Sequence, residues 1–201
     1  MARSGAVEDF LAARQDAGID RSLAARLRRQ LATRGPVPDE VLLGPAGGSM
    51  IAFDYDDADI LRAEDRAGGF SVTATVLFAS PDGQVIETRD EELTFVPSGE
   101  GYACVRVVPT NVISWDATAA QRASDAGIAR DLDRLKEYWR RPENPEQVVA
   151  FSISDVERRS GGDVVVSCLR YTANPGQRGF ETNATSVVIT KQDGSFQPNS
   201  H

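Results

Sequence analysis

The sequence predicts an α+β fold made of two tandem units, each a helix followed by a four-stranded antiparallel meander, with an extra helix at the N-terminus. Two observations favour this fold. Residues 51–102 and 149–196 carry the same landmarks in the same order, beginning with Ile51-Ala52-Phe53 in one and Val149-Ala150-Phe151 in the other. Within both stretches, apolar and polar residues alternate with the period of a strand that buries one face. The chain is therefore predicted to contain one β-rich unit twice.

Two short helices are predicted before the first meander. The first runs from about Ala6 to Gln15 and ends at Gly18; its positions with helical spacing are Val7, Phe10, Leu11 and Arg14. The second has an apolar stripe formed by Leu23, Leu27 and Leu31. Its other face is basic and carries Arg21, Arg26, Arg28, Arg29 and Arg34. A solvated helix face explains these arginines better than a partner site does.

The first meander is expected to have strands at 50–58, 69–79, 84–97 and 101–108. In the second of these strands, apolar side chains alternate with Ser and Thr from Phe70 to Phe78, which predicts a sheet with one face on the core. We match the glycines Gly68-Gly69 to Gly161-Gly162 in the later copy. This match places Val165, Ser167, Leu169 and Tyr171 on the core face, and Arg170 on the exposed face.

The long helix between the meanders is predicted at about 118–141. Its apolar stripe consists of Ile128, Leu132, Leu135 and Trp139, and Pro142 follows its end. The later strands are then expected at 147–158, 162–173, 179–191 and 194–197. We place the two units at residues 1–110 and 111–201, either as separate bodies or joined through one sheet or a common core.

The composition limits the classes of partner. The 201 residues carry a net charge of −8, and such a surface does not suit nucleic acid, which binds basic surfaces. No apolar run approaches the ~20 residues of a membrane span. We therefore expect a cytoplasmic protein and leave open a periplasmic or secreted one that has lost its signal peptide. The oligomeric state is not indicated.

The residues that usually carry catalysis or bind metals are scarce. His201 is the single histidine and lies at the C-terminus, which disfavours Ser-His and Cys-His mechanisms and a zinc site. Cys104 and Cys168 fall at different places in the two copies, so we expect two buried thiols and leave a single bridge between the copies open. We predict no cofactor and no metal, and we lean towards a protein that is not an enzyme.

An acidic run, Asp54, Asp56, Asp57 and Asp59, is the sharpest local charge feature. A 12-residue calcium loop needs a glycine at its sixth position, where this chain has Asp59, so calcium is disfavoured. Alternation along the strand instead puts Phe53 and Tyr55 inward and Asp54 and Asp56 outward. We expect an acidic sheet edge that docks a basic protein partner.

Three segments, Val7–Arg14, Val72–Phe78 and Leu93–Val96, give the chain a pattern that resembles the nuclear transport factor 2-like and cystatin-like families of helix-plus-meander folds. The resemblance covers residues 6–104 and again 118–197. In such families the cone between helix and sheet holds a small molecule, is filled by side chains, or presents its sheet to a protein. Members include tandem proteinaceous inhibitors. Here the resemblance implies that a pocket would be lined by Phe78, Phe95, Trp139 and Tyr171.

Two functions of different classes follow from these observations. The first is a non-catalytic, acidic binding module for a protein partner, of inhibitor or immunity type. The alternative is a small-molecule pocket protein, with or without isomerase- or hydrolase-like activity. A purely structural domain of a larger assembly is a third possibility.

Overall fold

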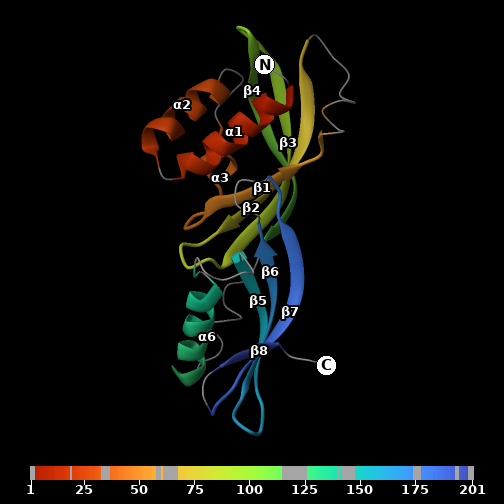
Figure 1. The fold of residues 1–201 in the computed structure, drawn as a ribbon. Coiled ribbons are helices and arrows are strands. Elements are labelled where there is room, and N and C mark those ends of the chain that lie inside the picture. Colours follow the sequence, from red (N-terminus) through yellow and green to blue (C-terminus); the bar gives the residue numbers. More distant parts are fainter. Residues whose placement is uncertain are drawn as a thin grey trace. The chain divides into compact units, whose positions relative to one another are not determined.

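The computed structural model describes residues 3–18, 20–32, 37–57, 60, 68–114, 126–139, 141, 148–173, 178–192 and 195–198, with only the backbone at 126–129. The chain divides into two compact units (Figure 1). The first contains Met1–Phe78 and Glu87–Ser114, and the second contains Ala79–Ile86 and Trp115–His201. The turn at residues 79–86 lies in sequence between two strands of the first sheet, but it belongs to the second unit.

The first unit is a four-stranded antiparallel meander with helices packed on one face (Figure 1). The helices are α1 (Arg3–Ala17), α2 (Arg21–Leu31) and the short α3 (Asp39–Leu42). The strands are β1 (Ser49–Tyr55), β2 (Phe70–Ala79), β3 (Val85–Ser98) and β4 (Gly101–Ser114), in the order β1-β2-β3-β4. The sequence missed α3, which is only four residues long.

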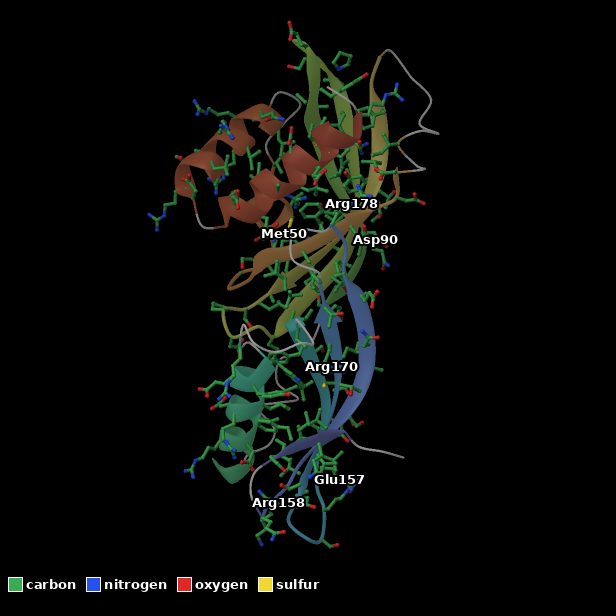
Figure 2. All side chains as sticks on the ribbon, viewed as in Figure 1. Met50, Asp90, Glu157, Arg158, Arg170 and Arg178 are labelled. Atoms are coloured by element: carbon green, nitrogen blue, oxygen red, sulfur yellow. The ribbon has the colours of Figure 1, made fainter. Side chains whose placement is uncertain are left out.

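The predicted alternation on β2 is confirmed, because Phe70, Val72, Ala74, Val76 and Phe78 all lie in the first core. Met50, at the start of β1, is buried in the same core (Figure 2). The ring of Phe95 stacks on Phe70 at a centroid distance of 4.9 Å and meets the edge of Phe10 at 6.0 Å. The helix stripe predicted for α1 is also buried, including Arg14.

The fourth strand is longer than predicted. It continues past Pro109 to Ser114, so the predicted boundary between residues 110 and 111 falls inside β4. The register with β3 shifts between Asp90 and Glu91, where Thr110 is the extra residue. A proline is tolerated on an edge strand beside such an irregularity because no ladder hydrogen bond is lost there.

The second unit repeats the helix and meander with a single long helix. It contains α6 (Ala126–Trp139), β5 (Val148–Arg158), β6 (Val164–Thr172), β7 (Glu181–Ile189) and β8 (Phe196–Pro198), with the strand order β5-β6-β7-β8. Leu132, Leu135 and Trp139 pack into its core, as the predicted stripe requires. The two sheets are separate, and the predicted α+β fold of two helix-plus-meander units is confirmed.

The prediction of which β6 side chains face the core is wrong by one residue, so the two faces of the strand are exchanged. Its core residues are Val164, Val166 and Cys168, so Val165, Ser167, Leu169 and Tyr171 face away from this core. Arg170, predicted to be exposed, shares the face of Cys168, and its Nε atom is buried. A slip of one residue exchanges the two faces of a strand.

The glycine turns explain the slip. Gly68 and Gly162 have positive φ angles, 81° and 94°, and each is followed two residues later by the first residue of a strand. Gly68 therefore corresponds to Gly162, and the offset between β2 and β6 is one residue larger than predicted. The predicted match of Leu93 and Phe95 to Val187 and Ile189 is confirmed, because all four side chains lie in the cores.

Candidate functional site

Of the predicted acidic run, Asp54 lies in β1, an edge strand of the first sheet. Asp56 and Asp57 follow its last residue, because the strand ends at Tyr55 and not at residue 58 as predicted. Asp54, Asp56 and Asp57 are exposed, and Asp59 lies outside the described residues. Tyr55 is buried between them, and its hydroxyl donates to the carbonyl of Ser4 at 3.2 Å. The Asp54 carboxylate accepts a hydrogen bond from the Tyr55 backbone N–H at 2.8 Å. A buried tyrosine thus fixes a strand end that presents carboxylates to solvent.

The four residues predicted to line a pocket are divided between the two units. Phe78 and Phe95 are fully buried in the first core. Trp139 lies in the second core, with its ring 5.2 Å from that of Phe151. Tyr171 is buried on the other face of β6, 6.1 Å from the ring of Phe180, and burial raises the pKa of its phenol. Phe78, Phe95 and Trp139 fill space between helix and sheet.

The first unit contains a buried charge cluster, formed by Arg14, Glu87, Arg89 and Glu91, that sequence reasoning missed. Arg14 and Glu91 are completely buried and joined by two hydrogen bonds, one of them from Arg14 Nη2 to Glu91 Oε1 at 3.1 Å. Arg14 also donates to the carbonyls of Leu42 at 3.0 Å and Val41 at 2.9 Å. The guanidinium thereby connects α1, the end of α3 and β3.

Arg89 completes the buried charge cluster from the same strand as Glu91. Its Nε lies 3.1 Å from Glu87 Oε1 and 3.2 Å from Glu91 Oε1, although neither approach has hydrogen-bond geometry. Its Nη2 donates to the carbonyl of Glu40 at 2.9 Å, and its guanidinium lies 4.3 Å from the centre of the Phe78 ring. Burial lowers the pKa of Arg89, and the two carboxylates oppose that effect.

The buried charge cluster binds elements together and has no evident role in proton transfer, because an arginine keeps its proton in proteins. Its two positive and two negative side chains balance. The signal for it was present in the sequence. Arg14 stands on the apolar stripe of α1, and Arg89 and Glu91 alternate with the core residues Leu93 and Phe95 on β3.

Cys104 and Cys168 are both buried and form no disulfide, which agrees with the prediction of two buried thiols. Burial raises the pKa of Cys104 to about 12, and its Sγ donates to the carbonyl of Arg106 at 3.4 Å. A thiol of this kind stays protonated at neutral pH and is a poor nucleophile. In the described part of the chain, no three His, Cys, Asp or Glu side chains are grouped so as to hold a metal ion.

Comparisons with known protein families, with curated proteins and with solved structures found no match to this chain. The resemblance to nuclear transport factor 2-like and cystatin-like folds therefore stays a prediction. Among the described helices, none combines the length and apolar character needed to span a membrane. The acidic end of β1 is the feature on which a function can be argued.

Proposed function

We propose that this protein is a non-catalytic binding module, and that the acidic end of β1 engages a protein partner with a basic surface. One observation carries the proposal: Asp54, Asp56 and Asp57 are all exposed at the end of an edge strand. The side chain of Tyr55 is buried in the first core and thereby holds the backbone that carries these carboxylates in place. Rigid presentation of like charges is what a complementary basic surface recognises.

The charge of the whole molecule supports the same partner class. A net charge of −8 attracts basic proteins over distances set by the ionic strength. An inhibitor or immunity protein that acts on a basic protein in the cytoplasm is the specific form of function that we favour. Such a role needs surface complementarity and no catalytic group.

The test uses surface-immobilised basic proteins and Lys/Arg-rich peptides of defined sequence as probes. We expect the wild-type protein to bind some of them at low ionic strength and to bind less as salt is added. The triple variant Asp54→Asn, Asp56→Asn and Asp57→Asn should bind more weakly, mainly because association slows. Undiminished binding by the triple variant, or binding by neither protein, rejects the proposal.

A charge-matched control separates local recognition from net charge. Glu8, Asp9 and Asp16 are exposed acids on α1 in the same unit. The variant Glu8→Gln, Asp9→Asn and Asp16→Asn removes the same number of charges, and we expect it to keep most of the binding. Equal losses in the two triple variants would show that the end of β1 has no special part in binding.

The small-molecule alternative has less support. Ligand sites are concave and keep part of their lining open to the ligand. Phe78, Phe95 and Trp139 are instead packed against other core side chains. We therefore rank a pocket with isomerase- or hydrolase-like activity behind the binding module.

A further inference from the structure

The end of β4 is an edge segment with exposed apolar side chains. Residues 110–114 are all exposed, and Val112 and Ile113 keep 49% and 48% of their surface accessible. Neighbouring residues of a strand point to opposite faces, so these two side chains make both faces of the sheet apolar at this edge. We call residues 110–114 the open β4 edge.

Apart from Thr110, the extra residue at the register shift, the open β4 edge is held in a regular strand. Asn111, Val112, Ile113 and Ser114 pair in continuous register with residues of β3. Asp90, on β3, accepts a hydrogen bond from Asn111 Nδ2 at 3.3 Å, and its backbone carbonyl accepts one from Thr110 Oγ1 at 3.2 Å (Figure 2). A pairing partner would therefore meet a strand that is already formed, and little ordering would be needed on this side.

Two other sheet edges carry protection that the open β4 edge does not show among the described residues. The β1 edge carries exposed acids. On β5, the N–H of Phe151 donates to the carbonyl of Gly83 at 3.0 Å, and Phe151 forms a parallel bridge with Gln84. Charges, prolines, short strands and covering segments are the means by which proteins prevent pairing at sheet edges.

On β4 itself, only the first half of the strand edge is protected against pairing with another strand. In the first half of the strand, Gln30 of α2 donates from Nε2 to the carbonyl of Cys104 at 3.1 Å, and Arg106 is exposed. After Pro109 the strand contains no charged residue. The contrast confines the unprotected stretch to the five residues of the open β4 edge.

The open β4 edge is complementary to itself. In an antiparallel pair of two copies, Thr110 and Ser114 come together at the ends and Val112 lies at the centre. No charge meets a like charge, whereas two β1 edges would bring acids together. A symmetric contact of this kind, with the same patch on both chains, is the commonest way for soluble chains to associate.

We propose that the open β4 edge pairs with the same edge of a second copy of this chain, in antiparallel orientation, to form a symmetric dimer. Five residues from each copy make a contact well below the ~1,600 Å² of a standard interface. The dimer is therefore weak and depends on concentration. This association is independent of the acidic end of β1 and uses a different edge.

Sedimentation velocity of the full-length protein over a wide range of concentration tests the proposal. We expect reversible dimerisation of the wild-type protein and loss of the dimer in the double variant Val112→Lys and Ile113→Lys, since edge lysines oppose strand pairing. Circular dichroism checks that this variant stays folded. A wild-type protein that remains monomeric at its highest soluble concentration overturns the proposal, and so does a dimer that survives the double substitution.

Two controls make the result specific to this edge. Val149 is also exposed, at 38%, on an edge strand whose pairing groups are partly engaged through Phe151, so Val149→Lys should leave the dimer intact. The triple variant of Asp54, Asp56 and Asp57 should dimerise like the wild type. Loss of the dimer in either control contradicts the assignment to β4.

A cross-linking experiment reads the geometry directly. Cys104 and Cys168 are buried, so Val112→Cys introduces the one exposed thiol among the described residues. At the centre of an antiparallel pair, this thiol should form a disulfide between two copies under mild oxidation. Val149→Cys is the matched control. Equal cross-linking of both variants would reflect random collision and would overturn the proposed register.

Discussion

The two units share a framework but fill it differently. Core positions on β3 and β7 correspond, since Leu93 matches Val187 and Phe95 matches Ile189. Two residues earlier on the inward face, the first unit has the buried Glu91, and the second has Thr185, which is partly exposed. The first unit buries charges at the positions that the second leaves to solvent.

The difference depends on the helices. In the first unit, the backbone carbonyls of three α3 residues, Glu40, Val41 and Leu42, accept hydrogen bonds from Arg14 and Arg89. The described part of the second unit has α6 as its single helix and no counterpart of α3. Buried charges are costly unless they are paired and their hydrogen bonds are made. A short helical segment thus supplies the acceptors that make this core possible.

The largest expected effect comes from breaking the buried charge cluster. Glu91→Ala leaves Arg14 without its carboxylate, and such a change costs about 3–5 kcal/mol in the free energy of unfolding. Hydrogen exchange should show faster exchange in β2 and β3, while β6 stays protected. Glu92→Ala, at the next and partly exposed position, is the control and should have little effect.

A combined variant sharpens this comparison by giving the first unit an apolar core like the second. Arg14→Met, Glu87→Gln, Arg89→Met and Glu91→Leu together remove the costly charges along with their partners. Replacing a whole buried ion cluster by apolar residues is often neutral or stabilising by about 1–4 kcal/mol. Unfolding of this variant should resemble that of the wild type. Instability as large as that of Glu91→Ala would mean that the charges themselves are required.

A somewhat smaller effect is expected from the apolar core of the second unit. Leu135 is 1% exposed, and Leu135→Ala should cost roughly 2–5 kcal/mol because it leaves a cavity. Hydrogen exchange should now speed up in β6 and β7 and leave β2 unchanged. The exposed Glu137 of the same helix gives the control, Glu137→Ala. Equal exchange changes in both units would contradict the division of the chain.

A smaller effect is expected at the turn glycines, and it tests whether Gly68 corresponds to Gly162 and not to Gly161. Gly68→Ala and Gly162→Ala each force a side chain into a left-handed conformation, at about 1–2 kcal/mol. Gly161→Ala should stay within about 0.5 kcal/mol, because Gly161 does not have a positive φ and a Cβ there would meet open space. Thermal unfolding of the three variants measures these differences. A larger loss of stability in Gly161→Ala than in Gly162→Ala would support the original match of Gly68 to Gly161.

The smallest effect concerns Asp82, in the turn that belongs to the second unit. Burial raises the pKa of this carboxyl, but hydrogen bonds from Ser80 and from Lys136 at 2.9 Å outweigh that effect and lower it below its usual value. A lowered pKa in the folded state adds stability that is complete above the ordinary value near 4 and is lost as the pH falls through the folded value. Asp82 is half exposed, so solvent screening limits the gain to about 0.2–1 kcal/mol.

The pH dependence of thermal unfolding checks this contribution. Asp82→Asn should be less stable than the wild type at neutral pH, and the two proteins should converge in acid. Lys136→Met should produce a similar loss at neutral pH. A difference between Asp82→Asn and the wild type that grows as the pH falls would show that the sign is wrong.

The sequence predicted the order of strands and the buried stripes because both follow from local periodicity. It placed β2, the core pair Leu93 and Phe95 and the described part of α6 correctly, while residues 118–125 of the predicted helix and the side chain of Ile128 lie outside the described residues. The phase of β6 was wrong because two adjacent glycines look alike in a sequence, and only the backbone angle shows which of them forms the turn. Alternation shows that every second residue of a strand faces the core. To decide which set of residues that is, the position of at least one residue must be known.

The buried charge cluster was missed for a different reason. Arg14 and Glu91 are 77 residues apart, and although each stands on a predicted core face, that position does not show which group it pairs with. Their pairing depends on contacts between elements, which local pattern does not contain. Asp54 and Asp56 were predicted correctly as exposed, but simple alternation does not hold along β1, because Met50 lies in the core and Ala52 is buried.

The turn between β2 and β3 has a practical consequence for anyone who divides this protein. Because residues 79–86 complete the second unit, no single cut yields two intact halves. A fragment that begins at residue 115 would lack Gly83, and the N–H of Phe151 would lose its acceptor. During synthesis the ribosome releases this turn long before β5 exists. The second unit therefore packs against a turn that was synthesised earlier.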